Sequence, residues 1–282
     1  MKKVVSFSGG RTSAYLCYLM IEKYGVKNVD VVYMDTGFEH PRTYDFIRNC
    51  AKWLGAQITF LRGDFSKPIG MGVGYSVVDV DSVGCDGKPF AEMMRKYGTP
   101  YIGGMFCTDR MKLKPFKKYC DDKYGKGNYE TWLGIRADEP MRLTEKKGIR
   151  YLAEISDFEK EDVINFWSKQ GFDLEIPEHL GNCVFCPKKS NLKLAAAQRD
   201  EPELYIEWLD MLYSDSVRVD DKTGHYSKMY RGKQSLEQLI ATFDGSTGEE
   251  IKARMRGAKH LDTGNCSESC EVFSEDQLDL FK

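Results

Sequence analysis

Short apolar runs alternate with amphipathic stretches along the first 170 residues of the chain. Residues 4–7, 29–34 and 58–61 are apolar enough to form buried strands, and residues 13–23 and 41–54 have the apolar spacing of helices. Pro41 suits the first turn of the second helix, and Gly25 ends the first. Strands that alternate with helices predict an α/β fold with a doubly wound, mostly parallel, Rossmann-like sheet.

The pattern weakens between residues 65 and 104, where many glycines predict loops and one short helix near residues 91–97. Beyond it we expect a basic helix over about 109–123, strands over 129–135 and near Tyr151, and a helix over 159–170. A helix around 192–213, a polar turn near 220–224 and two helical stretches up to Arg256 follow. We therefore expect an α/β domain over 1–180, a helical C-terminal extension over 181–262, and a flexible tail over 263–282.

Composition is that of an ordinary globular protein of 282 residues, with a net charge of −2. That charge gives no general attraction to nucleic acid or anionic membranes, although residues 107–126 and 183–199 are locally basic. No apolar run approaches the ~18 residues of a membrane helix, so we expect a cytoplasmic protein without membrane contact. Nine cysteines, an odd number, then favour metal ligation, reactivity or core packing over a disulfide framework.

A Ser-Gly-Gly turn connects the first strand to the first helix. Backbone N–H groups and the positive end of a helix converge at such a turn, which suits a phosphate or pyrophosphate, and glycine lets the backbone approach closely. A simple tight connection is the alternative for the turn alone. Its position and the polar residues that end the second strand favour a nucleotide site, whose candidate residues are Ser6, Ser8, Gly9, Gly10, Arg11, Thr12, Ser13, Asp35, Thr36 and Gly37.

These segments carry a family resemblance. Residues 6–13 resemble the PP-loop of the adenine nucleotide alpha-hydrolase-like superfamily, and residues 34–44 resemble the second-strand signature of the phosphoadenosine phosphosulfate (PAPS) reductase family. The resemblance runs in order to about Ser190 and implies adenine nucleotide binding. One position departs from the pattern, because PP-loops that use ATP usually carry Asp where this chain has Thr12.

Cys183-Val184-Phe185-Cys186 is a C-x-x-C motif, which can hold a metal or cluster, form a redox pair, or be buried. Together with Cys107 and its basic flank, it resembles the cysteine elements of cluster-containing adenylyl sulfate reductases. The resemblance implies a [4Fe-4S] cluster on Cys107, Cys183 and Cys186, with Cys266 as our choice of fourth ligand; Cys270, Cys120 or an open site are the alternatives. Cys17 and Cys50 are interpreted as core residues.

Three basic residues match positions that contact oxyanions in the same family, namely Arg110, Lys112 and Arg136, and we assign them to catalysis. His40 fits acid–base work or a structural hydrogen bond equally well. The family's C-terminal Glu-Cys-Gly-Leu-His motif, which carries the reductase nucleophile, is absent, and Phe106 replaces the first cysteine of the tandem pair.

Three functions therefore remain open. The first is ATP-dependent adenylation coupled to sulfur transfer, with a [4Fe-4S] cluster, ATP or another adenine nucleotide, and Mg²⁺ as cofactors. The second is reduction of an adenylyl or phosphoadenylyl sulfate to sulfite. The third is a non-catalytic nucleotide-binding protein with an iron–sulfur or zinc site. The first function implies a sulfur or electron donor protein as a partner and permits a nucleic-acid substrate. We also expect a homo-oligomer.

Overall fold

The structure is a computed structural model that describes residues 1–102, 104, 106–219 and 230–258. Its strands are β1 (Lys2–Phe7), β2 (Val29–Met34), β3 (Ile58–Asp64), β4 (Gly74–Val78), β5 (Tyr129–Leu133) and β6 (Ile149–Tyr151). Its helices are α1 (Arg11–Tyr24), α2 (Pro41–Leu54), α3 (Lys88–Tyr97), α4 (Lys114–Tyr124), α5 (Lys160–Trp167), α6 (Asn191–Asp200), α7 (Pro202–Leu212), α8 (Leu236–Ala241) and α9 (Gly248–Ala258).

The described strands form one sheet in the order β4-β3-β2-β1-β5-β6, and only β4 is antiparallel to its neighbour. The chain moves outward from β1 to β3 and then returns to place β5 on the other side of β1. Strand order therefore reverses between β1 and β5, the point at which open α/β sheets bind their ligands. The predicted α/β fold, with its mostly parallel sheet, is confirmed.

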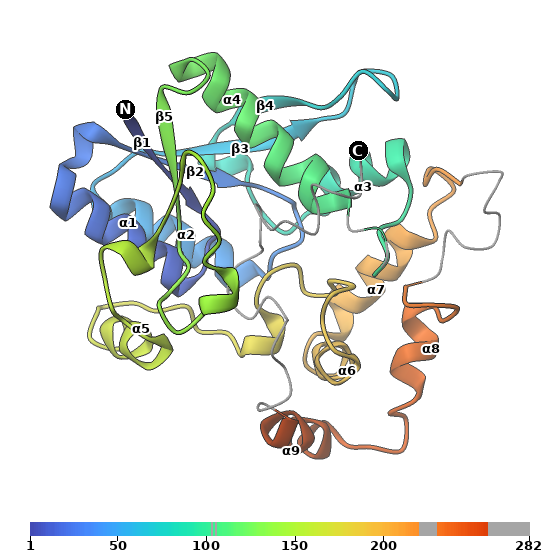
Figure 1. The fold of residues 1–282 in the computed structure, drawn as a ribbon. Coiled ribbons are helices and arrows are strands. Elements are labelled where there is room, and N and C mark those ends of the chain that lie inside the picture. Colours follow the sequence, from blue (N-terminus) through green and yellow to red (C-terminus); the bar gives the residue numbers. More distant parts are fainter. Residues whose placement is uncertain (103, 105, 220–229, 259–282) are drawn as a thin grey trace.

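Alternation along the strands sends side chains to two cores. Val5 and Phe7 of β1 pack with α1, α2 and α5 on one face, whereas Val4 packs with α4 on the other. Figure 1 shows these helices on opposite sides of the strands. Each face is thus covered, as parallel strands require.

The helices after residue 180 pack beside the carboxyl edge of the sheet rather than on its faces (Figure 1). Their core contains Trp208 of α7, Leu239 of α8 and Val184, and it also includes Phe38 and residues of α3 such as Met93. The helical C-terminal region is therefore joined to the α/β part by a shared apolar core. The residue boundaries of the three expected parts stay predictions.

Three local expectations were wrong. Residues 65–104 contain β4 as well as loops, because a glycine-flanked edge strand has little apolar patterning. The helix over 192–213 is two helices, since Pro202 lacks an N–H and restricts Glu201 to a non-helical conformation (φ −131°, ψ 64°). The basic helix begins with a π-helical turn, Thr108–Leu113, just before Pro115, which cannot donate to a preceding carbonyl.

Candidate functional site

The loop after β1 closes on the first turn of α1. The backbone N–H of Ser8 donates to Ser13 Oγ over 3.2 Å, the two serine hydroxyls are 2.9 Å apart, and Ser13 Oγ donates to the carbonyl of Gly10. Gly10 is the N-cap of α1, so the unpaired N–H groups of the first turn face the loop. Ser6 lies half-buried in β1. This geometry suits an anionic group at the helix N-terminus.

Gly9 is required by both conformation and space. Its φ is +82°, and a Cβ at this position would lie 2.9 Å from Ile47 and 3.0 Å from Thr43. Gly25 has the same φ of +82° but no atom within 4 Å of its Cβ position, so it isolates the conformational cost. We expect Gly25→Ala to lower the free energy of unfolding by about 1 kcal/mol, and Gly9→Ala by about 2–4 kcal/mol because of the added overpacking.

Urea denaturation of the two variants and the unchanged chain, monitored by circular dichroism, measures both costs. Equal losses of stability in the two variants would show that Ile47 and Thr43 do not confine the loop, contrary to this expectation.

Arg11 extends away from the loop. Its guanidinium forms a bidentate pair with Asp173, at 2.7 and 3.0 Å, and also donates to the carbonyl of Leu174. Arg11 thereby joins the start of α1 to a segment 162 residues later in the chain. The predicted contact between Arg11 and a phosphate stays a prediction, and the structure gives the residue a positioning role.

Arg136 follows β5, the strand on the other side of β1 from β2, and its side chain contacts the loop. Nη1 donates to Thr12 Oγ1 over 3.2 Å, while Nε and Nη2 donate to the two carboxylate oxygens of Asp138 at 2.8 and 3.2 Å. Gly134, at the end of β5, allows this approach, because a Cβ there would lie 2.9 Å from the backbone of Ser13. The predicted basic residue Arg136 is thus buried directly beside the predicted loop.

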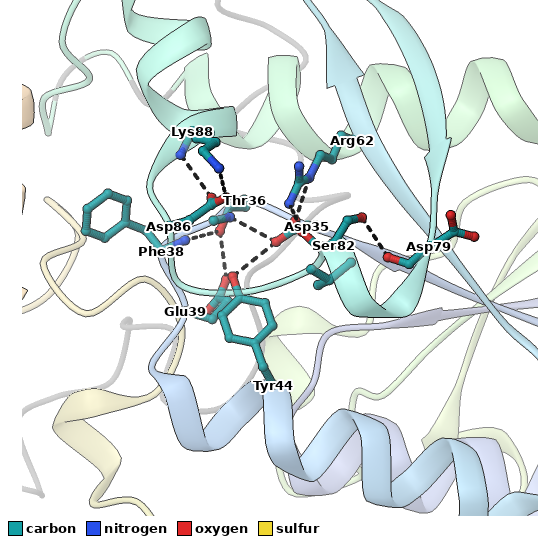
Figure 2. Close-up of polar contacts among 12 residues, drawn as sticks. Asp35, Thr36, Phe38, Glu39, Tyr44, Arg62, Asp79, Ser82, Asp86 and Lys88 are labelled. Carbon is teal, nitrogen blue, oxygen red and sulfur yellow. Dashed lines mark hydrogen bonds and ion pairs between the residues drawn. The ribbon is translucent and has the colours of Figure 1, made fainter.

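Asp35 is the centre of a buried polar network at the end of β2 (Figure 2). Its carboxylate accepts hydrogen bonds from Arg62 Nε at 2.7 Å, Gly37 N at 3.0 Å and the Tyr44 hydroxyl at 3.1 Å. Burial raises the pKa of Asp35, whereas the Arg62 guanidinium and the other two donors oppose that rise. Both carboxylate oxygens contact protein groups, so Asp35 orders the turn that carries Thr36 and Gly37.

Glu39, which the sequence analysis did not select, connects this turn to the cysteine motif. Its side chain is 2% exposed, and Oε1 lies 3.3 Å from Lys112 Nζ, 3.4 Å from Thr36 Oγ1 and 3.7 Å from Cys183 Sγ. The backbone of Glu39 also pairs with that of Cys183. Lys112, assigned to an oxyanion, is therefore an ion-pair partner of Glu39 here.

A pocket joins the loop to Glu39. It lies among the loop, the start of α2 and the chain that leads to the cysteine motif. Its lining residues are Ser8, Gly9, Gly10, Arg11, Glu39, Thr43, Leu174, Ile176, Pro177, Glu178, Gly181 and Asn182. Asn182 has a φ of 55°, a left-handed conformation that asparagine tolerates, and it directs the chain from the pocket wall into Cys183.

Cys107, Cys183 and Cys186 are brought to one region from two distant segments. All three are half-buried, and after burial itself their negative charges are the next causes that raise the pKa of the buried Tyr230. Within the described part of the chain, no three His, Cys, Asp or Glu side chains are placed to hold a metal ion. Cys266 and Cys270 lie outside the described residues.

Two cations hold the segment that carries the C-x-x-C motif. Lys189 is buried and donates to the carbonyls of His179 and Val184, and Arg231 donates to those of Pro187 and Lys189. Burial lowers the pKa of Lys189 to about 8, while negative charge on Cys186 and Cys183 opposes this effect. The motif thus lies near a buried cation and, through Cys183, near the Glu39 carboxylate.

The other cysteine, histidine and arginine residues considered in the sequence analysis make packing or capping contacts. Cys17 and Cys50 lie in the main core, as predicted, and Cys120 lies in the core on the other sheet face, away from the other cysteines. His40 caps α2 by accepting from the N–H of Arg42. Arg110 stacks on Tyr97, with its guanidinium carbon 5.0 Å from the ring centre.

Two lysines on the surface of the basic helix form ion pairs within the helix. Lys117 pairs with Asp121 at 2.7 Å and Lys118 with Asp122 at 3.0 Å, each one helical turn apart. Such exposed pairs contribute little to stability, and they reduce the positive potential that a polyanion would meet.

The structure is thus an α/β domain with a glycine loop between its first strand and its first helix. Residues 2–67 match the family model of the phosphoadenosine phosphosulfate reductase domain, which confirms the predicted family over these residues. The chain belongs to the family of the uncharacterized nin region protein ORF290 of Escherichia phage lambda, to which it is 50% identical over 99% of this chain and 98% of the relative.

More distant relatives include two uncharacterized proteins of Methanocaldococcus jannaschii. They are 25% and 26% identical over 74% and 73% of this chain, which spans 41% and 46% of their lengths. Two solved structures are similar to this chain. PAPS reductase from Candida auris is 16% identical, with 60% of this chain and 72% of the reductase covered and a TM-score of 0.37. The NAD synthetase of Campylobacter jejuni is 14% identical, with 96% of this chain and 89% of the synthetase covered and a TM-score of 0.36. No helix in the described residues has the length and apolar character of a membrane span.

Proposed function

We propose that this protein binds an adenine nucleotide at residues 8–13 and uses ATP to activate an oxygen atom of its substrate as an adenylate, which a sulfur species then displaces. The observation that carries this proposal is the contact of Glu39, a wall of the loop pocket, with Cys183. A nucleotide site and a cysteine motif that share one wall can act on the same substrate.

Three cysteines supply the sulfur side of this proposal. Cys107, Cys183 and Cys186 lie in one region near the buried Tyr230, and thiolates are the usual ligands of a [4Fe-4S] cluster, although the described side chains are not arranged as a closed metal site. When bound, such a cluster would supply an iron for a sulfur species or electrons for reduction. Cys266 remains our proposed fourth ligand, and a sulfur or electron donor protein remains a proposed partner.

On the nucleotide side, the first turn of α1 binds the phosphates through backbone N–H groups. The Ser8 and Ser13 hydroxyls belong to this loop, and Arg136, which contacts Thr12 of the loop, would place positive charge near the negative charge that develops on the departing pyrophosphate. Lys112 and Arg110 complete the proposed basic set. Mg²⁺ would accompany the pyrophosphate in this reaction.

Two assays on anaerobically purified protein separate the proposed reaction from its alternatives. We expect pyrophosphate release from ATP and Mg²⁺ when sulfide and cellular RNA or DNA are supplied, and no sulfite release from adenylyl sulfate or PAPS with a thiol reductant. Sulfite release would instead establish the reductase, which the match of residues 2–67 favours. Nucleotide binding with neither product would point to the non-catalytic alternative.

A further inference from the structure

Glu39, which lines the loop pocket, has one buried carboxylate oxygen with no hydrogen-bond partner among the described residues. This oxygen is Oε2, whereas the other oxygen meets Lys112, Thr36 and Cys183. A buried carboxylate oxygen without a donor costs free energy, so proteins seldom retain one unless water, an ion or a ligand supplies the missing partner. Glu39 therefore indicates part of a binding site.

A second polar atom in the same pocket supports this interpretation. Thr43 Oγ1 is buried, lacks a partner among the described residues, and belongs to a residue that lines the pocket together with Glu39 and the loop glycines. Two polar atoms of this kind, on residues that line a pocket beside a loop suited to phosphate, indicate a polar group attached to that phosphate.

The charge around Glu39 decides which group fits. Lys112 already compensates the carboxylate at Oε1, so a second cation is not needed at Oε2. A phosphate there would meet like charge, whereas a hydroxyl can donate to Oε2. In parallel α/β nucleotide sites, an acidic residue near the second strand commonly accepts from a ribose hydroxyl. Glu39 follows β2, which ends at Met34.

We propose that Glu39 Oε2 accepts a hydrogen bond from a ribose hydroxyl of the bound nucleotide and thereby selects ribonucleotides that carry no phosphate on the 2′ or 3′ oxygen. The inference rests on the proposed nucleotide binding and deepens it. Its consequence is that the site takes ATP or an adenylyl group and rejects 3′-phosphorylated nucleotides such as PAPS.

Isothermal titration of the full chain with ATP, 2′-deoxy-ATP, 3′-deoxy-ATP and adenosine 3′,5′-bisphosphate tests this. We expect the unchanged protein to prefer ATP to at least one deoxy analogue by about 10- to 100-fold, as a hydrogen bond to a charged group implies. In Glu39→Gln this preference should fall about fivefold or more, and the affinity for the bisphosphate should rise about tenfold.

Glu178→Gln is the matched control. Glu178 lines the same pocket, but Lys160 and Lys193 occupy its oxygens at 2.9 and 3.2 Å, so the ratio of ATP to deoxy-ATP affinity should not change. An equal loss of selectivity in both variants would overturn the role of Glu39.

Other outcomes are equally decisive. ATP binding with no preference over either deoxy analogue would overturn the inference and leave the proposed function standing. No binding of ATP at all would overturn both. If Glu39→Gln fails to fold, as a thermal melt would show, the selectivity of the unchanged protein decides alone, because equal affinities for ATP and the bisphosphate contradict the proposal.

Discussion

Replacement of Arg136 by methionine is expected to weaken ATP binding about 100-fold. Methionine keeps much of the apolar stem but removes the guanidinium that lies between Thr12 and Asp138. The loop then loses both a positive charge and a hydrogen bond to Thr12, and Asp138 and Glu139 lose their arginine partner beside the proposed phosphate site. Loss of a charged hydrogen bond, about 1.5–3 kcal/mol, together with the exposed negative charge accounts for this magnitude.

Arg150→Met is the matched control for this measurement. Arg150 lies in the edge strand β6, pairs with Glu154 and packs on Trp132, but its side chain is 49% exposed and it does not line the loop pocket. Titration calorimetry should give an ATP affinity within about twofold of the unchanged protein, because exposed pairs contribute little. Similar losses in both variants, with unchanged melting temperatures, would mean that Arg136 does not act at the nucleotide.

The part of the site that could be predicted from sequence is the part made by local chain. The strand, glycine turn and helix of residues 2–24 are adjacent in sequence, so their apolar period and the glycine pair indicate the loop without tertiary information. The same holds for β2 and α2, whose bounds match the expected ones. Pro202 was also visible as a helix boundary, but the apolar period on both sides of it concealed the break.

The contacts that join distant segments could not be predicted in this way. Glu39 and Cys183 are 144 residues apart, and Arg11 and Asp173 are 162 apart, so neither pairing leaves a periodic signal. Glu39 stands between Phe38 and His40, before a proline, where the local pattern indicates only a helix start. The family resemblance selected Arg136, which the structure places beside Thr12, because it supplied the long-range information that spacing lacks.

Cys183→Ser is expected to remove most of the iron from the protein. The anaerobically purified chain should be brown and carry roughly four irons and four sulfides, the content of one [4Fe-4S] cluster. Serine preserves the backbone pairing with Glu39 but replaces the thiolate ligand. Because the change removes one of the two thiolates of the C-x-x-C motif from the proposed ligand set, iron, sulfide and the broad absorbance near ~400 nm should fall together, and turnover should be lost.

Cys85→Ser is the control, because Cys85 is also half-buried and burial raises the pKa of its thiol to about 12, which makes it a poor ligand. It should keep its full iron content. The same assay on Cys266→Ser tests the proposed fourth ligand: reduced iron supports it, and full iron with full turnover favours an open site or Cys270. The proposed cluster would be contradicted if the unchanged protein were colourless and carried one zinc, or if the Cys183→Ser protein kept all its iron. The nucleotide site is tested separately, by Arg136→Met.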